Sequence, residues 1–221
     1  TLALHDALPI WADLYYNRRN NNYRIIGVKY ADFKFVKGRY ILDEAAKTCC
    51  EIQQYIPDFR MNINVSYVQI MHGNVERDIL DVIKRYALKP DSIYIEMTES
   101  GFMDMTPAFC KFRKALDENH ISFVIDDFGT GYSSLNHIRE MPLDIIKIDK
   151  CFIEHLGEDD FSDAFVKMVT ELANTIGVHV CVEGVETDRQ YAIIKKMGIY
   201  YIQGYFFDKP MCIESFEEKY I

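Results

Sequence analysis

The sequence lacks the features that mark membrane-spanning and secreted proteins. No run of 18 apolar residues occurs in its 221 residues, so no segment is predicted to cross a membrane. No basic segment followed by an apolar stretch opens the chain, which predicts a cytoplasmic protein without a secretory signal. Basic residues are in the minority, 25 against 34 acidic ones, and the formal net charge of −9 argues against binding to nucleic-acid polymers or anionic membranes.

Metal-binding or redox cysteine pairs are also absent. None of the six cysteines belongs to a Cys-x-x-Cys pair, and a chain of this length can build a core without disulfide bonds. We therefore expect reduced, mostly buried thiols. The six histidines show no paired ligand spacing, and the glycine-containing loop DDFGTGYSS (126–134) does not fit the GxxxxGK[ST] pattern of phosphate-binding loops.

What the sequence does contain is an alternation of apolar runs and helix-like stretches, within a globular composition of 49% hydrophobic and 27% charged residues. Runs rich in β-branched and aromatic residues predict strands at Met61–Val65, Ile93–Met97, Ile121–Ile125, Ile145–Ile148, Val178–Val182 and Tyr200–Ile202, with Arg24–Tyr30 as a weaker candidate. Helical spacing of apolar residues predicts helices at Tyr40–Tyr55, Glu76–Tyr86, Pro107–Asn119, Phe161–Ile176 and Arg189–Met197.

This alternation predicts an α/β fold with parallel strands and right-handed crossovers. The nearest standard architecture is a TIM-like (β/α)₈ barrel, with its first strand or strands absent or distorted; an open doubly wound sheet is the alternative. No linker interrupts the chain, so residues 24–221 are read as one domain. Residues 1–23 are treated as a suspect or non-native N-terminal segment. The stretch NRRNNNYR (17–24) is predicted to be a polar, basic surface loop.

Polar side chains stand at or just after the end of each of the six clear strands. They are Asn64, Glu96, Asp126, Asp127, Lys147, Glu183 and Gln203. Barrel enzymes place their chemistry at this end, and several buried carboxylates need cations to neutralise them. The set therefore predicts oxygen-liganded metals such as Mg²⁺ or Mn²⁺. A single Asp after a strand is more often a helix N-cap, but six polar strand ends favour a site.

These motifs, in this order, resemble the EAL family of cyclic-di-GMP phosphodiesterases. The matching segments are NVS (64–66), EMTES (96–100), DDFGTGYSSL (126–135), IKID (146–149), EGVET (183–187) and QGYFFDKP (203–210). The resemblance covers about residues 38 to 221. It implies a TIM-like barrel that binds the bacterial second messenger cyclic-di-GMP and hydrolyses it to linear pGpG with two Mg²⁺ or Mn²⁺ ions.

The resemblance also implies which residues bind the metals. Asn64, Glu96 and Asp126 look like ligands of one ion. Asp127 would bind the second ion or bridge the pair.

The other motif residues would then act on water, substrate or the supporting structure. Glu183 matches the general base, and Lys147 would hold the nucleophilic water or a phosphate oxygen. Glu186 and Gln203 would support the metals and their water, and Gln203 would also contact substrate. Glu99 looks like the carboxylate that anchors the DDFGTG loop.

The Glu-Ala-Leu signature that names the family is not intact. Counting back over the family's usual interval places it at Asp6-Ala7-Leu8, with Ile10 where the family has an arginine. Asp6 is one methylene shorter than Glu, and Ile10 cannot bind phosphate as Arg does. If residues 1–10 are not native, we expect the first strand to be absent and the barrel to be left open.

Two interpretations follow. One is a cyclic-di-GMP phosphodiesterase, and the other is a catalytically inactive EAL domain that acts as a cyclic-di-GMP receptor or a protein-interaction module. The resemblance also implies a homodimer and an upstream GGDEF or sensory domain.

Overall fold

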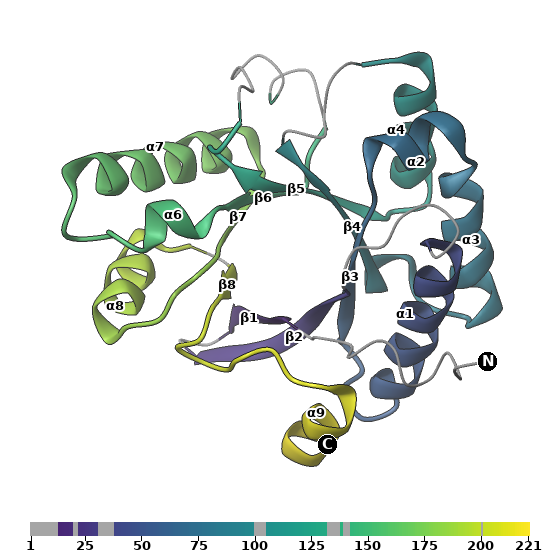
Figure 1. Cartoon of the computed structure of the whole chain (residues 1–221), viewed down its shortest axis with the longest axis horizontal. Coiled ribbons are helices and arrows are strands. Elements are labelled where there is room, and N and C mark those ends of the chain that lie inside the picture. Colours follow the sequence, from purple (N-terminus) through teal and green to yellow (C-terminus); the bar gives the residue numbers. More distant parts are fainter. Residues whose placement is uncertain are drawn as a thin grey trace, which may run out of the picture.

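Eight strands form a closed barrel in chain order, with helices on its outside (Figure 1). The computed structural model describes residues 13–19, 22–30, 38–99, 105–131, 138, 142–199 and 201–221. The strands are β1 Asp13–Arg19, β2 Asn22–Tyr30, β3 Arg60–Asn64, β4 Ile93–Thr98, β5 Ser122–Phe128, β6 Ile145–Ile148, β7 His179–Val182 and β8 Tyr201–Gln203. The TIM-like prediction is confirmed, and the open doubly wound sheet is excluded.

Most of the described helices lie on two opposite sides of the barrel, and the last, α9, lies below β1 and β2 in the view of Figure 1. In Figure 1, α1–α4 cover the strands from β3 to β5, while α6–α8 cover those from β6 to β8. Their bounds are α1 Gly38–Gln53, α2 Tyr67–His72, α3 Val75–Arg85, α4 Pro107–Glu118, α6 Lys150–Ile153, α7 Asp160–Ile176, α8 Asp188–Met197 and α9 Ile213–Tyr220, with a 3₁₀ turn, η2, at Pro90–Ser92. The five predicted helices are confirmed, and the short α2, α6 and α9 were not predicted.

The beginning of the barrel differs from the prediction. β1 pairs antiparallel with both β2 and β8, whereas β2 to β8 are all parallel. The interpretation of NRRNNNYR as a surface loop is wrong, because residues 17–19 and 22–24 belong to β1 and β2. Pairing with neighbouring strands decides these strands, not their own composition.

The barrel is also closed, so the expected open barrel is wrong. The strand that closes it against β8 is β1, which begins at Asp13 and does not include residues 1–10. The proposed boundary between residues 23 and 24 stays a prediction, with β1 and the start of β2 before it. Asp6 and Ile10 lie outside the described residues.

Strands β3 to β8 are largely buried on both faces, which explains why they read as nearly continuous apolar runs. Outward-facing residues such as Met61, Ile95 and Ile146 pack against the helices in the main core. A second, smaller cluster fills the barrel interior and consists of Tyr94, Val124, Ile145, Cys181 and Tyr201. Two positions further along each of these strands, the interior residues become polar, and this layer forms the candidate site.

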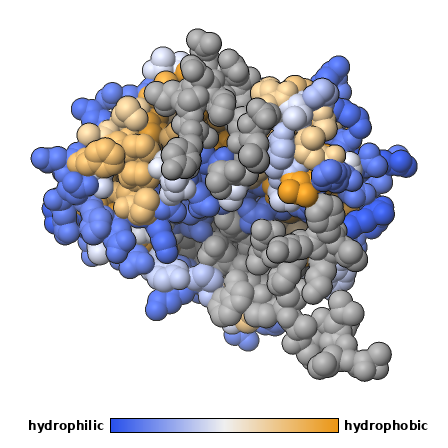
Figure 2. Space-filling view, turned by 45° about the horizontal axis from the view of Figure 1, so that its top comes forward, coloured by the Kyte–Doolittle hydropathy of each residue, from blue (hydrophilic) through white to orange (hydrophobic). Residues whose placement is uncertain are grey.

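None of the helices in the described part of the chain combines the length and the apolar character that crossing a bilayer requires. Figure 2 shows a largely hydrophilic face with an apolar patch on the side where α6–α8 lie. On α7, Phe161 is 67% exposed and lies against Phe152 and Phe165.

Candidate functional site

Lys147 lies at the centre of the polar layer. Its Nζ is 2.9 Å from Asp126 Oδ1 and 3.4 Å from Glu96 Oε1, and it also forms an ion pair with Glu183. Lys147 and Glu96 are fully buried, and Asp126 is 1% exposed. Buried charges are tolerated when they are paired, so each of these groups depends on the others.

A β-bulge brings two consecutive carboxylates to the same place. The pairing of β5 with β6 passes from Ile125–Ile146 directly to Phe128–Ile148, so Asp126 and Asp127 both stand opposite Lys147. Asp127 has the left-handed backbone angle φ +55, and its N–H donates to Asp126 Oδ1 at 3.1 Å. In a regular strand these two side chains would point to opposite faces.

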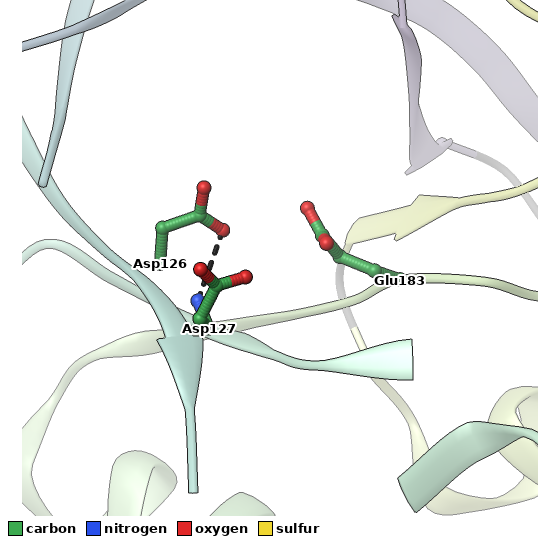
Figure 3. A group of neighbouring side chains, drawn as sticks. All are labelled: Asp126, Asp127 and Glu183. Carbon is green, nitrogen blue, oxygen red and sulfur yellow. Dashed lines mark hydrogen bonds between the residues drawn. The ribbon is translucent and has the colours of Figure 1, made fainter. Parts of the chain in front are cut away.

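The bulge completes a group of three carboxylates. Oxygens of Asp126, Asp127 and Glu183 all lie within 4.8 Å of one another. Figure 3 shows the three side chains converging from the end of β5 and from the residue that follows β7. Three negatively charged oxygens at this spacing fit a hard divalent cation such as Mg²⁺ or Mn²⁺, so these residues could hold one.

Glu96 is held by a residue that the sequence did not single out. Asn62 Nδ2 donates to Glu96 Oε1 at 2.5 Å inside the barrel. The signal was present in the strand MNIN, since Asn62 shares the interior face with Asn64. Asn64 itself stands in register with Glu96 and borders a cavity of about 140 Å³ beside α2 and α3.

The loop after β5 is anchored from two sides. The N–H of Gly129 donates to Glu99 Oε2 at 2.6 Å, and a Cβ at Gly131 would lie 3.0 Å from Glu99 Oε1. A Cβ at Gly129 would lie 2.6 Å from the rings of both Phe152 and Phe165. Only glycine fits beside the carboxylate and these rings, so residues 129–131, which follow β5, are held in place.

A polar cavity of about 230 Å³ opens beside Glu183. It is lined by Lys150, Glu183, Gly184, Glu186, Gln203, Gly204, Tyr205 and Asp208. Glu186 is exposed at this cavity and is not part of the three-carboxylate group. Gln203 Oε1 is buried, and no donor in the described part of the chain meets it. The cavity therefore contains an acceptor that a bound ligand or water could satisfy.

Backbone contacts join the two loops that form this cavity. Val185 N–H donates to Gln203 O at 3.2 Å, and Phe206 N–H donates to Val185 O at 2.8 Å. A Cβ at Gly204 would lie 2.1 Å from Val185 O. Glycine is required here because two backbones approach closely, and this contact fixes Gln203 relative to the segment after Glu183.

Cys181, which stands in register with Lys147 on the neighbouring strand, carries an unreactive thiol. Burial raises the pKa of Cys181 well above its ordinary value, and the positive charge of Lys147 opposes this only in part. A cysteine nucleophile must be a thiolate. Cys181 is therefore a packing residue of the barrel interior.

The structure thus brings together five of the predicted site residues: Glu96, Asp126, Asp127, Lys147 and Glu183. Glu99 contacts the loop behind them, while Glu186 and Gln203 border the neighbouring cavity. Their individual roles stay predictions.

The sequence matches one family over most of its length. The EAL domain family model matches residues 38–210. A second match, to a CRISPR-Cas9 PI domain, covers residues 9–52 only, a small part of the chain.

Two curated relatives are named for cyclic-di-GMP turnover. Cyclic di-GMP phosphodiesterase PdeL of Escherichia coli is 29% identical over 184 residues, 83% of this chain and 51% of its own length. Bifunctional diguanylate cyclase/cyclic di-GMP phosphodiesterase MucR of Pseudomonas aeruginosa is 31% identical over 182 residues, 80% of this chain and 26% of its own length. The chain thus spans about half or less of these relatives.

Solved structures are similar over nearly the whole chain. The EAL enzyme Bd1971, in a form with bound cAMP and cyclic-di-GMP, has a TM-score of 0.86 at 25% identity, over 95% of this chain and 63% of that one. The PaMucR phosphodiesterase in complex with c-di-GMP has a TM-score of 0.80 at 26% identity, over 96% of this chain and 98% of that one.

Proposed function

Since the chain belongs to the EAL domain family, we propose that it binds cyclic-di-GMP at the carboxyl ends of its strands and hydrolyses it to linear pGpG. The observation that supports this most directly is the convergence of Asp126, Asp127 and Glu183 beside the buried Lys147. A barrel that needed only stability would not place three carboxylates together.

Mg²⁺ or Mn²⁺ would be held by Asp126, Asp127 and Glu183. Such an ion polarises a phosphodiester oxygen and lowers the pKa of an attacking water. Because Asp127 and Glu183 are half-buried while Asp126 is buried, the group faces solvent on one side and protein on the other.

The chain's own residues would supply the proton transfer and the positioning. Glu183 would accept the proton of the attacking water, as a carboxylate within reach of that water can do. Lys147 would keep Glu183 and Asp126 oriented through its ion pairs and would offer an ammonium to a phosphate oxygen. Gln203, in the adjoining cavity, would bind substrate through its amide.

The test is to incubate the purified chain with cyclic-di-GMP and Mn²⁺ and to separate the nucleotides by ion-exchange chromatography. We expect pGpG from the wild-type chain and none from Glu183→Gln, which keeps the shape of the side chain but not its charge. Glu118→Gln is the matched control, since Glu118 ends α4 and its one ion pair with a described residue is with Lys114 on the surface. Equal turnover by Glu183→Gln and wild type would refute the proposal.

The alternative is a receptor that binds cyclic-di-GMP without turnover. It is favoured by the loss of the Glu-Ala-Leu signature. Two results together would support this alternative over hydrolysis. Calorimetric titration in Ca²⁺ would show binding of cyclic-di-GMP, and incubation with Mn²⁺ would yield no pGpG.

We also propose partners and a location for this protein. A homodimer would use the aromatic surface around the exposed Phe161, which packs against the partly buried Phe152 and Phe165 beside Gly129. The relatives are longer than this chain, which is consistent with a GGDEF or sensory domain upstream of the barrel. We place the protein in the cytoplasm. Sedimentation velocity of wild type and Phe161→Ser tests the dimer.

A further inference from the structure

Glu183 belongs to two neighbouring features of the site. Its carboxylate converges with those of Asp126 and Asp127 (Figure 3), and it also lines the polar cavity of about 230 Å³. A ligand larger than a single phosphate can therefore occupy the carboxylate group and the cavity at once. Cyclic-di-GMP contains two phosphodiester groups, so when one lies at a cation held by the carboxylates, the other lies elsewhere on the protein.

The cavity presents one lysine beside its carboxylates. Among the described residues that line it, Lys150 carries a positive charge, whereas Glu183, Glu186 and Asp208 carry negative ones. A phosphodiester is an anion that carboxylates repel and that a lysine ammonium binds as a point charge. Within this cavity, the place next to Lys150 is therefore the favourable one for a phosphodiester.

The base of the Lys150 side chain is held by the residue that follows Glu183. Lys150 is the first residue of α6, whose N-cap is Asp149. Gly184 has φ +73, and a Cβ there would lie 2.5 Å from Lys150 Cβ and 3.2 Å from Lys150 Cα. Only glycine allows this approach, so the start of α6 is fixed beside the segment that carries Glu183.

Asp208 is the cavity carboxylate that the last helix engages. Lys219 forms an ion pair with Asp208 Oδ1, and the Tyr220 hydroxyl donates to Asp208 Oδ2. The Asp208 side chain is only 11% exposed. Both of its oxygens have a partner on α9, whereas no ion pair within the described part of the chain involves Lys150.

We infer that Lys150 binds the phosphodiester of cyclic-di-GMP that is not cleaved, and that α9 keeps Asp208 from pairing with this lysine. Lys150 would contact the nucleotide directly, while Lys219 acts through Asp208 as a positioning residue. The inference rests on the proposed function for the identity of the nucleotide. It does not depend on turnover, because a receptor that binds cyclic-di-GMP would use the same contact.

The first test is the affinity for cyclic-di-GMP, measured by isothermal titration calorimetry in Ca²⁺. We expect Lys150→Met to bind about tenfold more weakly, which is near the usual cost of losing a hydrogen bond to a charged group. Lys150→Arg keeps the charge and should bind nearly as tightly as the wild type. Lys114→Met is the matched control, because it removes the same charge from the surface of α4. Wild-type affinity in Lys150→Met would overturn the inference.

The second test separates the charge of Asp208 from the structural contribution of α9. Lys219→Met leaves the Asp208 carboxylate without its cation, so Asp208 can pair with Lys150 and repel the phosphodiester. We expect weaker binding in this variant and recovery in Lys219→Met/Asp208→Asn, which lacks the competing charge. If α9 mattered only for stability, the double variant would stay weak, since it also lacks the ion pair. That result, or unchanged affinity in Lys219→Met, overturns the role of α9.

The outcomes also distinguish this inference from the proposed hydrolysis. A wild-type chain that binds cyclic-di-GMP but forms no pGpG refutes hydrolysis and leaves the binding role of Lys150 to be decided by its variants. Formation of pGpG with unchanged affinity in Lys150→Met refutes the inference alone. A wild-type chain that does not bind cyclic-di-GMP at all overturns both.

Discussion

Asp127 directly follows Asp126 in β5, yet both residues stand opposite Lys147, because the bulge and the left-handed backbone of Asp127 turn both carboxylates to one side. Asp and Asn tolerate this conformation better than other residues with a Cβ, and β-branched residues tolerate it least. The backbone geometry and the ligand chemistry of position 127 can therefore be separated by mutation.

We expect Asp127→Asn to keep the stability of the domain and to lose most of its affinity for Mn²⁺. Asp127→Val should lose both, with a cost of about 1–3 kcal/mol in the free energy of unfolding, because valine is strained at this angle. Urea denaturation and Mn²⁺ titration of the two variants check this. Equal stabilities for the two variants would contradict the role of the bulge.

Removing the positive charge of Lys147 should be the most destabilising change in the barrel interior. Lys147→Met leaves Glu96, Asp126 and Glu183 without their shared partner, and breaking a buried charge pair typically costs about 3–5 kcal/mol. Urea denaturation at neutral pH measures this loss. Adding Glu183→Gln to Lys147→Met should recover part of it, and a double variant less stable than Lys147→Met would be inconsistent with electrostatic repulsion as the cause.

Glu99 should affect turnover through the loop that it anchors. Glu99→Ala removes the acceptor of the Gly129 N–H, whereas Glu99→Gln keeps an acceptor oxygen at the same place. We expect a lower kcat for pGpG formation in Glu99→Ala, by about tenfold or more given the usual cost of misplaced catalytic groups, and a value near wild type in Glu99→Gln. The KM for cyclic-di-GMP should change less than kcat.

Gly204 should tolerate no side chain, in contrast to a glycine at a helix end. An added Cβ at Gly204 would collide with the backbone of Val185, whereas at Gly198 it would meet open space. Gly198→Ala pays only the left-handed backbone penalty, about 1–2 kcal/mol. Gly204→Ala should destabilise more than this and weaken binding of cyclic-di-GMP; thermal melting and calorimetry would show it.

Cys151 provides a test of pH dependence away from the site. Partial burial and the neighbouring Asp149 carboxylate raise the pKa of its thiol to about 11. Since only the thiolate reacts, alkylation by iodoacetamide should be slow at pH 7.5 and rise about tenfold per pH unit up to pH 9.5, without a plateau. Asp149→Asn should lower this pKa and speed alkylation, which peptide mass spectrometry can follow. A plateau below pH 9 would contradict the raised pKa.

The sequence was informative wherever a strand is buried on both faces. Such strands read as apolar runs, and their ends stand out as the points where Glu96 or Lys147 interrupts the pattern. β1 could not be found in this way, since its place is set by pairing with β2 and β8, which are remote from each other in the chain.

The interior of the site was partly hidden for a similar reason. Asn62 looks like an ordinary strand residue until its register brings it to Glu96. The sequence does not predict the bulge either, because Asp126 and Asp127 look like the end of a strand followed by a loop. Which carboxylate meets which cation depends on the closure of the barrel, and no local pattern encodes it.

The pairing of β1 with β8 has a consequence for how the domain forms. Tyr15–Asn17 pair with Tyr201–Gln203, so β1, the first strand of the barrel in chain order, waits for β8, the last, before the ring can close. Such high contact order slows folding and keeps an unpaired strand edge exposed during synthesis. Gln203 belongs to that pairing and lines the polar cavity beside Glu183, so a chain that stops before β8 cannot form this cavity.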